Sequence, residues 1–283
     1  MDVEANKNEV VNASADRAPA TSVDTLRLEG ATVLAVWAHP DDESYLGGGL
    51  MAAAAAAGGR VVNVTATLGE HGTPDPVTMP PGRLARIRQH ELDHALQALG
   101  VSESITLGYE DGTLDTIDPD LGARRIMTVL DEIDPDVVVS FGPDGFTGHP
   151  DHIAVGAGTE RAVNARNPQP ALIQPALIQT ALIQTAVGRW IPLELVTAMD
   201  ELGAFFPGFA PEPRRTSDVR LALDDSAIDT KLAALSAHGS QTELFRAHLG
   251  DADYRRLAAV EAYFPANARA FDLLGASMAA TAA

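Results

Sequence analysis

Short, continuous apolar runs alternate with longer helical patterns along most of the chain, and this alternation limits the folds open to it. The runs that predict strands lie at residues 31–38, 60–67, 104–107 and 136–141. The patterns that predict helices lie at residues 46–58, 81–99, 118–133 and 152–163. Strands that are apolar on both faces and separated by helices are typical of a parallel sheet covered on both sides. We therefore predict an α/β fold with a mainly parallel sheet.

The C-terminal part of the chain continues this pattern less clearly. Residues 217–223 predict an edge strand, and residues 226–238 and 242–264 predict helices. Before them, residues 170–186 repeat Ala-Leu-Ile-Gln three times at a spacing of five residues. That spacing matches neither the helical period nor the strand period. We interpret the repeat as a local duplication in a tolerant surface segment.

We predict a single domain preceded by a tail. Residues 1–26 lack periodicity and predict a disordered N-terminal tail. The domain then covers residues 27–283. It consists of a core at 27–165, a variable segment with the repeat at 166–216, and C-terminal strand and helices at 217–283.

Composition removes several classes of function. A formal net charge of -19 should repel nucleic acids and anionic lipid surfaces, so no nucleic-acid partner is expected. The absence of cysteine excludes disulfides, thiol catalysis and cysteine-based zinc sites. No apolar window predicts a membrane span, and no signal peptide is evident. We expect a cytoplasmic protein, and the sequence is compatible with a homo-oligomer without defining one.

The sequence AHPDDES at residues 38–44 places a histidine and three acids directly after a predicted buried strand. One explanation is helix capping, because an aspartate before a helix and Glu43 in its first turn would satisfy free N–H groups. Capping accounts for one or two of these acids. It leaves His39 unexplained.

A second motif, GHPDHI at residues 148–153, repeats His-Pro-Asp after another predicted strand and before another predicted helix. Ligands of open α/β sheets bind outside the carboxyl ends of the strands. If both strands belong to one sheet, the two motifs face each other across that edge. Three histidines and several carboxylates would then meet, which indicates a metal site.

The residue types suggest how such a site would work. His39 and Asp42 can turn toward one ion, and a histidine of the second motif would supply a third ligand, with one position open for water. The ion lowers the pKa of that water, and a carboxylate that is not a ligand takes its proton. Asp41 suits this base role because consecutive residues in a turn point in different directions. The remaining histidine would stabilise an oxyanion or protonate a leaving amine, with Asp151 orienting it.

With these motifs the chain resembles the GlcNAc-phosphatidylinositol de-N-acetylase family, also called PIG-L or LmbE-like. The resemblance covers roughly residues 30–165. It includes TLGEHG at 67–72, RQHEL at 88–92 and YEDGTL at 109–114, with a weaker echo in AHGSQ at 237–241. It implies a Rossmann-like three-layer fold with the metal site at the carboxyl ends of the strands. It also implies hydrolysis of N-acetyl groups on glucosamine-containing substrates, usually with zinc.

Carried over residue by residue, the resemblance implies that His39, Asp42 and His152 bind the metal. It implies that Asp41 is the general base and that His149 stabilises the oxyanion or protonates the amine.

The same resemblance makes Glu70, Arg88 and Asp111 match substrate contacts of the mycothiol-pathway branch. From the residues alone, Arg88 could lie on a solvated helix face and Asp111 in an ordinary Asp-Gly turn. That branch also has a tyrosine at the position of Thr147, so the chain departs from it there.

The other histidines carry weaker signals. His238 and Gln241 end a predicted helix, and a surface pair is the simplest interpretation. His90, His94 and His248 lie on helical patterns and are expected to be structural.

Three other functions are open at this point. GGGLMA at residues 47–52 fits a dinucleotide-binding fingerprint, although the His-Asp cluster separates it from the strand. His39 and Asp41 with a distant histidine fit a non-haem Fe(II) oxygenase, although such sites normally occupy antiparallel β folds. A non-catalytic sugar-binding module would not need Asp41.

We predict an enzyme, a zinc-dependent N-deacetylase that acts on an N-acetylglucosaminyl small molecule, an amino-sugar conjugate. Fe(II) and Co(II) would also accept this ligand set. The sequence does not define the aglycone, the native metal, the oligomeric state, the role of the repeat or the consequence of Thr147.

Overall fold

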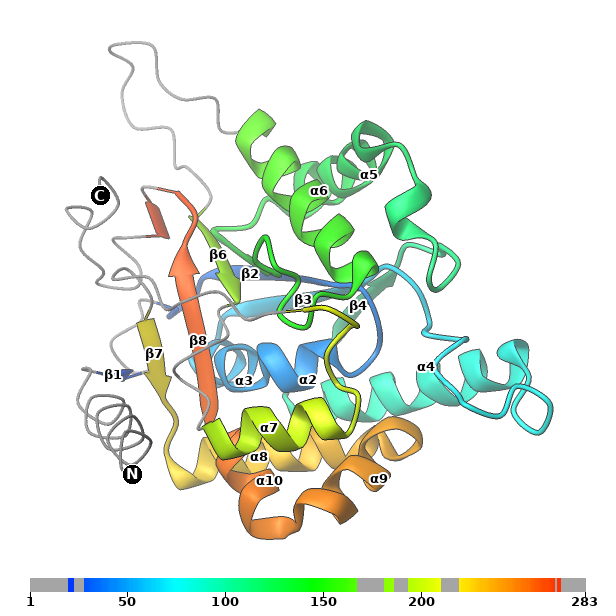
Figure 1. Cartoon of the computed structure of the whole chain (residues 1–283). Coiled ribbons are helices and arrows are strands. Elements are labelled where there is room, and N and C mark those ends of the chain that lie inside the picture. The colour runs from blue at the N-terminus through cyan, green and yellow to red at the C-terminus, as the bar shows by residue number, and fades with distance from the viewer. Residues whose placement is uncertain are drawn as a thin grey trace, which may run out of the picture.

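One mixed sheet organises the described part of the chain, with the strand order β1-β7-β8-β6-β5-β2-β3-β4 (Figure 1). The computed structural model describes residues 20–22, 28–166, 181–185, 193–209, 219–267 and 269–270. The strands are β1 (Ala20–Ser22), β2 (Thr32–Trp37), β3 (Arg60–Thr65), β4 (Glu103–Thr106), β5 (Val137–Ser140), β6 (Ala181–Thr185), β7 (Val219–Ala222) and β8 (Val260–Pro265).

Helices flank this sheet on both faces, as the predicted three-layer, Rossmann-like α/β fold requires. They are α2 (Asp42–Leu46), α3 (Gly48–Ala56), α4 (Pro81–Ala98), α5 (Pro119–Ile133), α6 (Pro150–Arg166), α7 (Leu193–Glu201), α8 (Asp225–Ala237), α9 (Gly239–Leu249) and α10 (Asp251–Ala258), with the short 3-10 helix η3 (Leu114–Thr116). Figure 1 shows α5 and α6 together on one side of the sheet, and α3, α4 and α8 on the other.

The centre of the sheet consists of β5, β2 and β3, which pair in parallel. Every residue of β5 is buried, as are five of the six residues of β2. Helices cover both faces there, so a strand must be apolar throughout, and this explains the continuous runs VLAVW and VVV. The prediction of a mainly parallel sheet is confirmed.

The predicted helix at 242–264 is wrong in its last part. Gly250, with φ of 77°, separates α9 from α10, and the chain then enters strand β8. This strand pairs antiparallel with both β6 and β7. The predicted edge strand at 217–223 is therefore not at an edge, because β7 is paired with β1 on its other side.

Two other segments take part in the sheet against expectation. Residues 20–22, within the predicted tail, pair with β7, so the tail does not extend over them. The third copy of the repeat forms β6 between β5 and β8, so this copy does not lie in a surface segment. The pairing partners decide both outcomes, and they are distant in sequence. The first two copies, at residues 171–180, lie outside the described residues.

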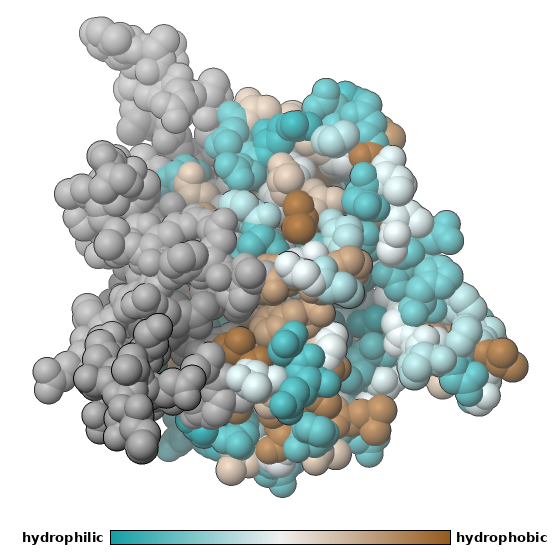
Figure 2. All heavy atoms as spheres, in the orientation of Figure 1, coloured by the Kyte–Doolittle hydropathy of each residue, from teal (hydrophilic) through white to brown (hydrophobic). Residues whose placement is uncertain are grey.

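The surface of the described residues is mixed. The face in Figure 2 is mostly hydrophilic, with apolar residues gathered near its middle. None of the helices in the described ranges is long and apolar enough to cross a membrane. Placement in the cytoplasm stays a prediction.

Candidate metal centre

The two His-Pro-Asp motifs meet at the point where the strand order reverses. From β2 the chain proceeds outward through β3 and β4, and it then returns to β5 on the other side of β2. His39 lies two residues beyond β2, and His149 directly precedes α6, which begins after the loop that leaves β5. Such a reversal opens a crevice at the carboxyl ends of the two strands, where open α/β sheets bind ligands.

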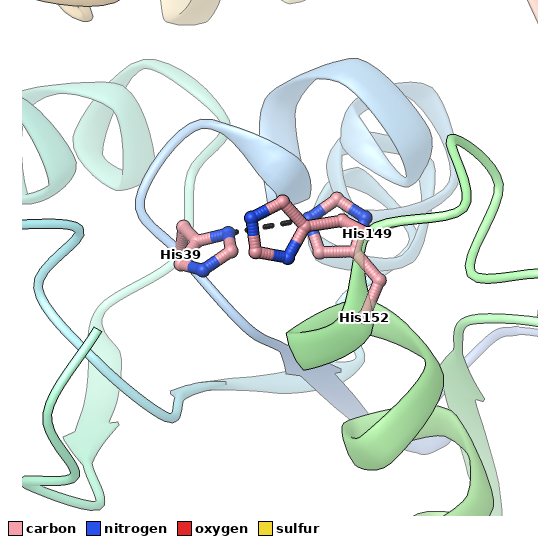
Figure 3. A group of neighbouring side chains, drawn as sticks. All are labelled: His39, His149 and His152. Atoms are coloured by element: carbon pink, nitrogen blue, oxygen red, sulfur yellow. Dashed lines mark hydrogen bonds between the residues drawn. The ribbon is translucent and has the colours of Figure 1, made fainter. Parts of the chain in front are cut away.

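Three side chains converge there, those of His39, Asp42 and His152. Nδ1 of His39 lies 3.2 Å from Nε2 of His152 (Figure 3). The Asp42 carboxylate lies 3.3 Å from His152 Nε2 and 3.7 Å from His39 Nδ1. All three side chains are buried. The residues predicted as metal ligands thus place their donor atoms around one point.

The hydrogen-bond partners of the two histidines direct their lone pairs toward that point. His39 Nε2 faces the carboxylates of Asp111 at 3.1 Å and Asp151 at 3.2 Å, which accept its hydrogen bond. His152 Nδ1 lies 2.9 Å from the carbonyl of Gly145, so this nitrogen carries the proton. Nδ1 of His39 and Nε2 of His152 are then left to face each other, an arrangement that a bound cation stabilises.

The charge around His39 agrees with a cation site. Burial lowers the pKa of His39, but the hydrogen bonds that His39 donates to Asp111 and Asp151 and the charge of Asp42 outweigh it and raise the pKa to about 10. The pocket therefore strongly favours a positive charge at this imidazole, either a proton or a metal ion next to it. The donor set, two imidazoles and a carboxylate, fits a catalytic divalent metal.

Asp41 has a different environment from Asp42. Its backbone is held at a φ of 107°, a left-handed conformation that is unfavourable for a residue other than glycine. Oδ2 of Asp41 lies 3.3 Å from Nη2 of Arg88. Burial raises the pKa of the Asp41 carboxyl to about 6, although the Arg88 charge lowers it. Such a value suits a group that takes a proton near neutral pH.

Glu43 and His238 were not expected in the site, and they hold the backbone of Asp41. Oε2 of Glu43 accepts a 2.9 Å hydrogen bond from the Asp41 N–H, and Oε1 lies 2.6 Å from Nε2 of His238. The predicted surface position of His238 is wrong, because the side chain is fully buried. Helix capping by the Asp41 side chain is also not observed. The motif AHGSQ, part of the family resemblance, indicated that His238 has a role. The sequence did not predict that its partner is Glu43.

Asp151 was expected to orient His149, but its carboxylate orients His39 instead. It accepts hydrogen bonds from the N–H groups of Gly112 and Leu114, at 2.8 and 3.0 Å, and these turn it toward His39. Only the backbone N–H of Asp151 contacts His149, donating to Nδ1 at 3.1 Å.

His149 lies at the mouth of the site, with its ring stacked on His152 at a centroid distance of 5.0 Å (Figure 3). Because Nδ1 accepts the Asp151 N–H, the neutral imidazole carries its proton on Nε2. Burial and the charge of His39 lower the pKa of His149. The side chain is therefore a neutral hydrogen-bond donor that faces the cavity.

Three residues were matched to substrate contacts, Glu70, Arg88 and Asp111. Among these three, Arg88 alone lines the cavity in front of the site. The Asp111 carboxylate accepts hydrogen bonds from His39 Nε2 and from the N–H of His71, so it positions the side chain of His39. Glu70 accepts the N–H of Asp111 at 3.1 Å. The Asp-Gly turn at 111–112 brings these groups together from beyond β4, which the sequence could not show.

The dinucleotide alternative is contradicted at α3. The N–H groups of Gly49 and Leu50 donate to the carboxylate of Glu261 at 2.6 and 3.0 Å. A Cβ at Gly49 would lie 2.6 Å from Leu223, so the glycine allows close packing. This helix N-terminus, where a dinucleotide phosphate would bind, is occupied by the protein's own carboxylate.

Comparison with known proteins places this chain in a family. The profile described as PIG-L: GlcNAc-PI de-N-acetylase matches residues 34–163. The solved structure of N,N'-diacetylchitobiose deacetylase from Pyrococcus horikoshii covers 93% of this chain, and the chain covers 91% of it, with a TM-score of 0.59 and 20% identity. At that identity the likeness concerns the fold.

Curated relatives agree with the profile. The 1D-myo-inositol 2-acetamido-2-deoxy-alpha-D-glucopyranoside deacetylase of Corynebacterium diphtheriae is 32% identical over 79% of this chain and 80% of its own length. The enzyme with the same description from Kineococcus radiotolerans is 37% identical over 46% of this chain, and only 44% of its own length is spanned. The chain belongs to the PIG-L family of GlcNAc-PI de-N-acetylases.

Proposed function

We propose that this protein is a metal-dependent N-deacetylase that hydrolyses the acetamido group of an N-acetylglucosaminyl small molecule. The observation that carries the proposal is the arrangement of His39 Nδ1, His152 Nε2 and the Asp42 carboxylate, which lie within 3.7 Å of one another with both imidazole protons directed elsewhere. The descriptions of the relatives, which name acetamido-sugar deacetylases, support the reaction class.

His39, Asp42 and His152 would hold the ion, and zinc is the ion we propose. Fe(II) and Co(II) are accepted by the same donor types. When bound, a divalent ion at this position would acidify a water molecule and polarise the acetyl carbonyl.

Asp41 and His149 would divide the proton transfers between them. Asp41 accepts a proton from the attacking water, whose oxygen forms the new bond to the acetyl carbon. His149, a neutral donor that also lines the cavity, stabilises the charge on the carbonyl oxygen. The C–N bond then breaks, and the nitrogen receives a proton from Asp41 or His149. The products are acetate and the free amine.

The Fe(II) oxygenase alternative fits this geometry less well. The form of this site indicated by the sequence, His39 with Asp41, would need Asp41 as a ligand, but the carboxylate of Asp41 lies beside Arg88, and Asp42 faces the two histidines. The strands that bring the histidines together are also parallel.

Asp41→Asn tests the proposal against a non-catalytic sugar-binding module. We expect the variant to keep a full equivalent of metal and to lose free-amine release from N-acetylglucosaminides by at least about a hundredfold, as the loss of a general base implies. Wild-type activity in the metal-loaded variant would contradict the base role. Sugar binding without amine release by the metal-loaded wild-type protein would support the binding module.

A further inference from the structure

The cavity in front of the metal centre has two unlike ends. One end consists of the motif residues. The other is formed by α7, α9, α10 and the start of β8, and its apolar side chains are Met199, Leu202, Leu244, Phe245, Leu257 and Val260. The cavity volume is about 790 Å³, within the range of small-molecule sites. In Figure 2 apolar residues gather in the corresponding part of the face, between α6 and the helices α7 and α9.

Met199, Phe245, Leu257 and Val260 pack against one another in this wall, but a leucine of the wall and a phenylalanine beside His149 are exposed to solvent. Leu244 is 84% exposed on α9 although it borders the cavity. Phe206 is 43% exposed, and its ring centroid lies 5.4 Å from that of His149. Exposed apolar side chains beside a polar site are typical of a surface that binds an apolar ligand.

The charged groups of the cavity are already engaged. Arg88 is the single arginine or lysine among the described residues that line it, and it donates to the carbonyls of Pro40 and Gly69 beside Asp41. Glu261, at the apolar end, is bonded to Lys231, to Tyr263 and to the start of α3. Within the described lining no free cation is therefore available to a carboxylated aglycone, and a polyhydroxylated one would lose hydrogen bonds to water against the apolar wall.

We infer that the substrate carries an apolar aglycone, an alkyl or aryl group, which lies along α7, α9 and α10 while the acetamido group faces the metal centre. This inference rests on the proposed function and names its substrate class. The wall is continuous with the catalytic cavity, so a glycoside whose sugar is at His149 would extend directly onto it.

The test compares N-acetylglucosaminides that differ only in the aglycone: methyl, octyl, phenyl, inositol and malate. With metal-loaded protein we expect kcat/KM for free-amine release to be at least about tenfold higher for the octyl and phenyl compounds than for the others. Each buried methylene contributes up to about fourfold. In Leu244→Gln the octyl-to-methyl ratio should fall at least about threefold. The matched control is Leu121→Gln, which changes another exposed leucine on α5, away from this cavity, and should leave the ratio unchanged.

The outcomes separate the inference from the proposed function. Equal or faster release from the inositol or malate compounds overturns the inference and leaves deacetylation intact. No metal-dependent release from any compound overturns both. A change of oligomeric state in Leu244→Gln, measured by light scattering, with an unchanged octyl-to-methyl ratio would show that the wall joins copies of this chain, and it would also overturn the inference.

Discussion

Nε2 of His238 lies 2.6 Å from Oε1 of Glu43, and both side chains are fully buried. Their sequence separation is 195 residues. The other oxygen of Glu43 accepts the N–H of Asp41, whose backbone has a φ of 107°. A contact between the residue that follows α8 and the first turn of α2 thus fixes the strained backbone of Asp41.

We expect the loss of this contact to reduce the rate rather than substrate or metal binding. In His238→Ala, Glu43 loses its partner and Asp41 can shift from its working position. Misplacement by about 1 Å costs up to a hundredfold, so kcat should fall about tenfold to a hundredfold, with KM and metal content unchanged. His238→Gln can still donate to Glu43 and should recover part of kcat.

His248→Gln is the matched control, because His248 is exposed on α9 and should keep wild-type kcat. Wild-type kcat in His238→Ala would contradict the positioning role. Loss of metal in that variant would assign His238 a structural role instead.

The same pair should make stability depend on pH in a defined direction. Burial disfavours both charges, but their attraction raises the pKa of His238 above 6.5 and lowers the pKa of Glu43 below 4.5. The contribution of His238 is fully present below pH 6.5 and is lost as pH rises through its raised pKa. That of Glu43 is present above pH 4.5 and is lost as pH falls through its lowered pKa.

The pair therefore stabilises the chain most between pH 4.5 and 6.5. Urea unfolding of metal-free protein measures the contribution of this pair to the free energy of unfolding. The excess in free energy of unfolding of the wild type over His238→Gln should be larger at about pH 5.5 than at about pH 8.5. A larger excess at the higher pH would refute the assignment.

His152→Ala should remove the metal. The variant loses one of three donors and leaves an open position, so metal content after dialysis should fall well below one equivalent. His94→Ala, on the exposed face of α4, should retain it. Full metal content in His152→Ala would show that the ligand set lies elsewhere, for example at His39, Asp111 and Asp151, whose donor atoms also cluster.

Lys231→Met should destabilise the fold. Lys231 Nζ lies 2.8 Å from Glu261, both side chains are inaccessible to solvent, and Glu261 also binds the start of α3. Removing one partner of such a pair leaves a buried charge, which costs about 3–5 kcal/mol. The double variant Lys231→Met/Glu261→Gln should recover part of the loss. Unfolding in urea within about 1 kcal/mol of the wild type for the single variant would contradict this role.

The features that could be predicted are the local ones. VLAVW and VVVS predict buried strands because a parallel sheet covered on both sides needs apolar residues on both faces. The two His-Pro-Asp motifs indicate the site because each is a short, contiguous turn at a strand end. The ring of donors around His39 and His152 follows once β2 and β5 are neighbours.

The features that were missed depend on distant partners. VEAYFP after α10 continues an apolar pattern compatible with a helix, and only its pairing with β6 and β7 makes it a strand. The place of the repeat in β6 is decided in the same way. Asp111 contacts His39, and His238 contacts Glu43. The residues next to Asp111 and His238 in the sequence do not predict these contacts.

Titration of chelator-stripped protein with Zn²⁺, while free-amine release from an N-acetylglucosaminide is followed, tests whether deacetylation depends on one metal ion and on Asp41. We expect no release without metal and a rise that saturates at one equivalent in the wild type. In Asp41→Asn we expect the same binding curve without amine release. Release by the stripped protein, or full release by Asp41→Asn, would show that this site does not work in the proposed way.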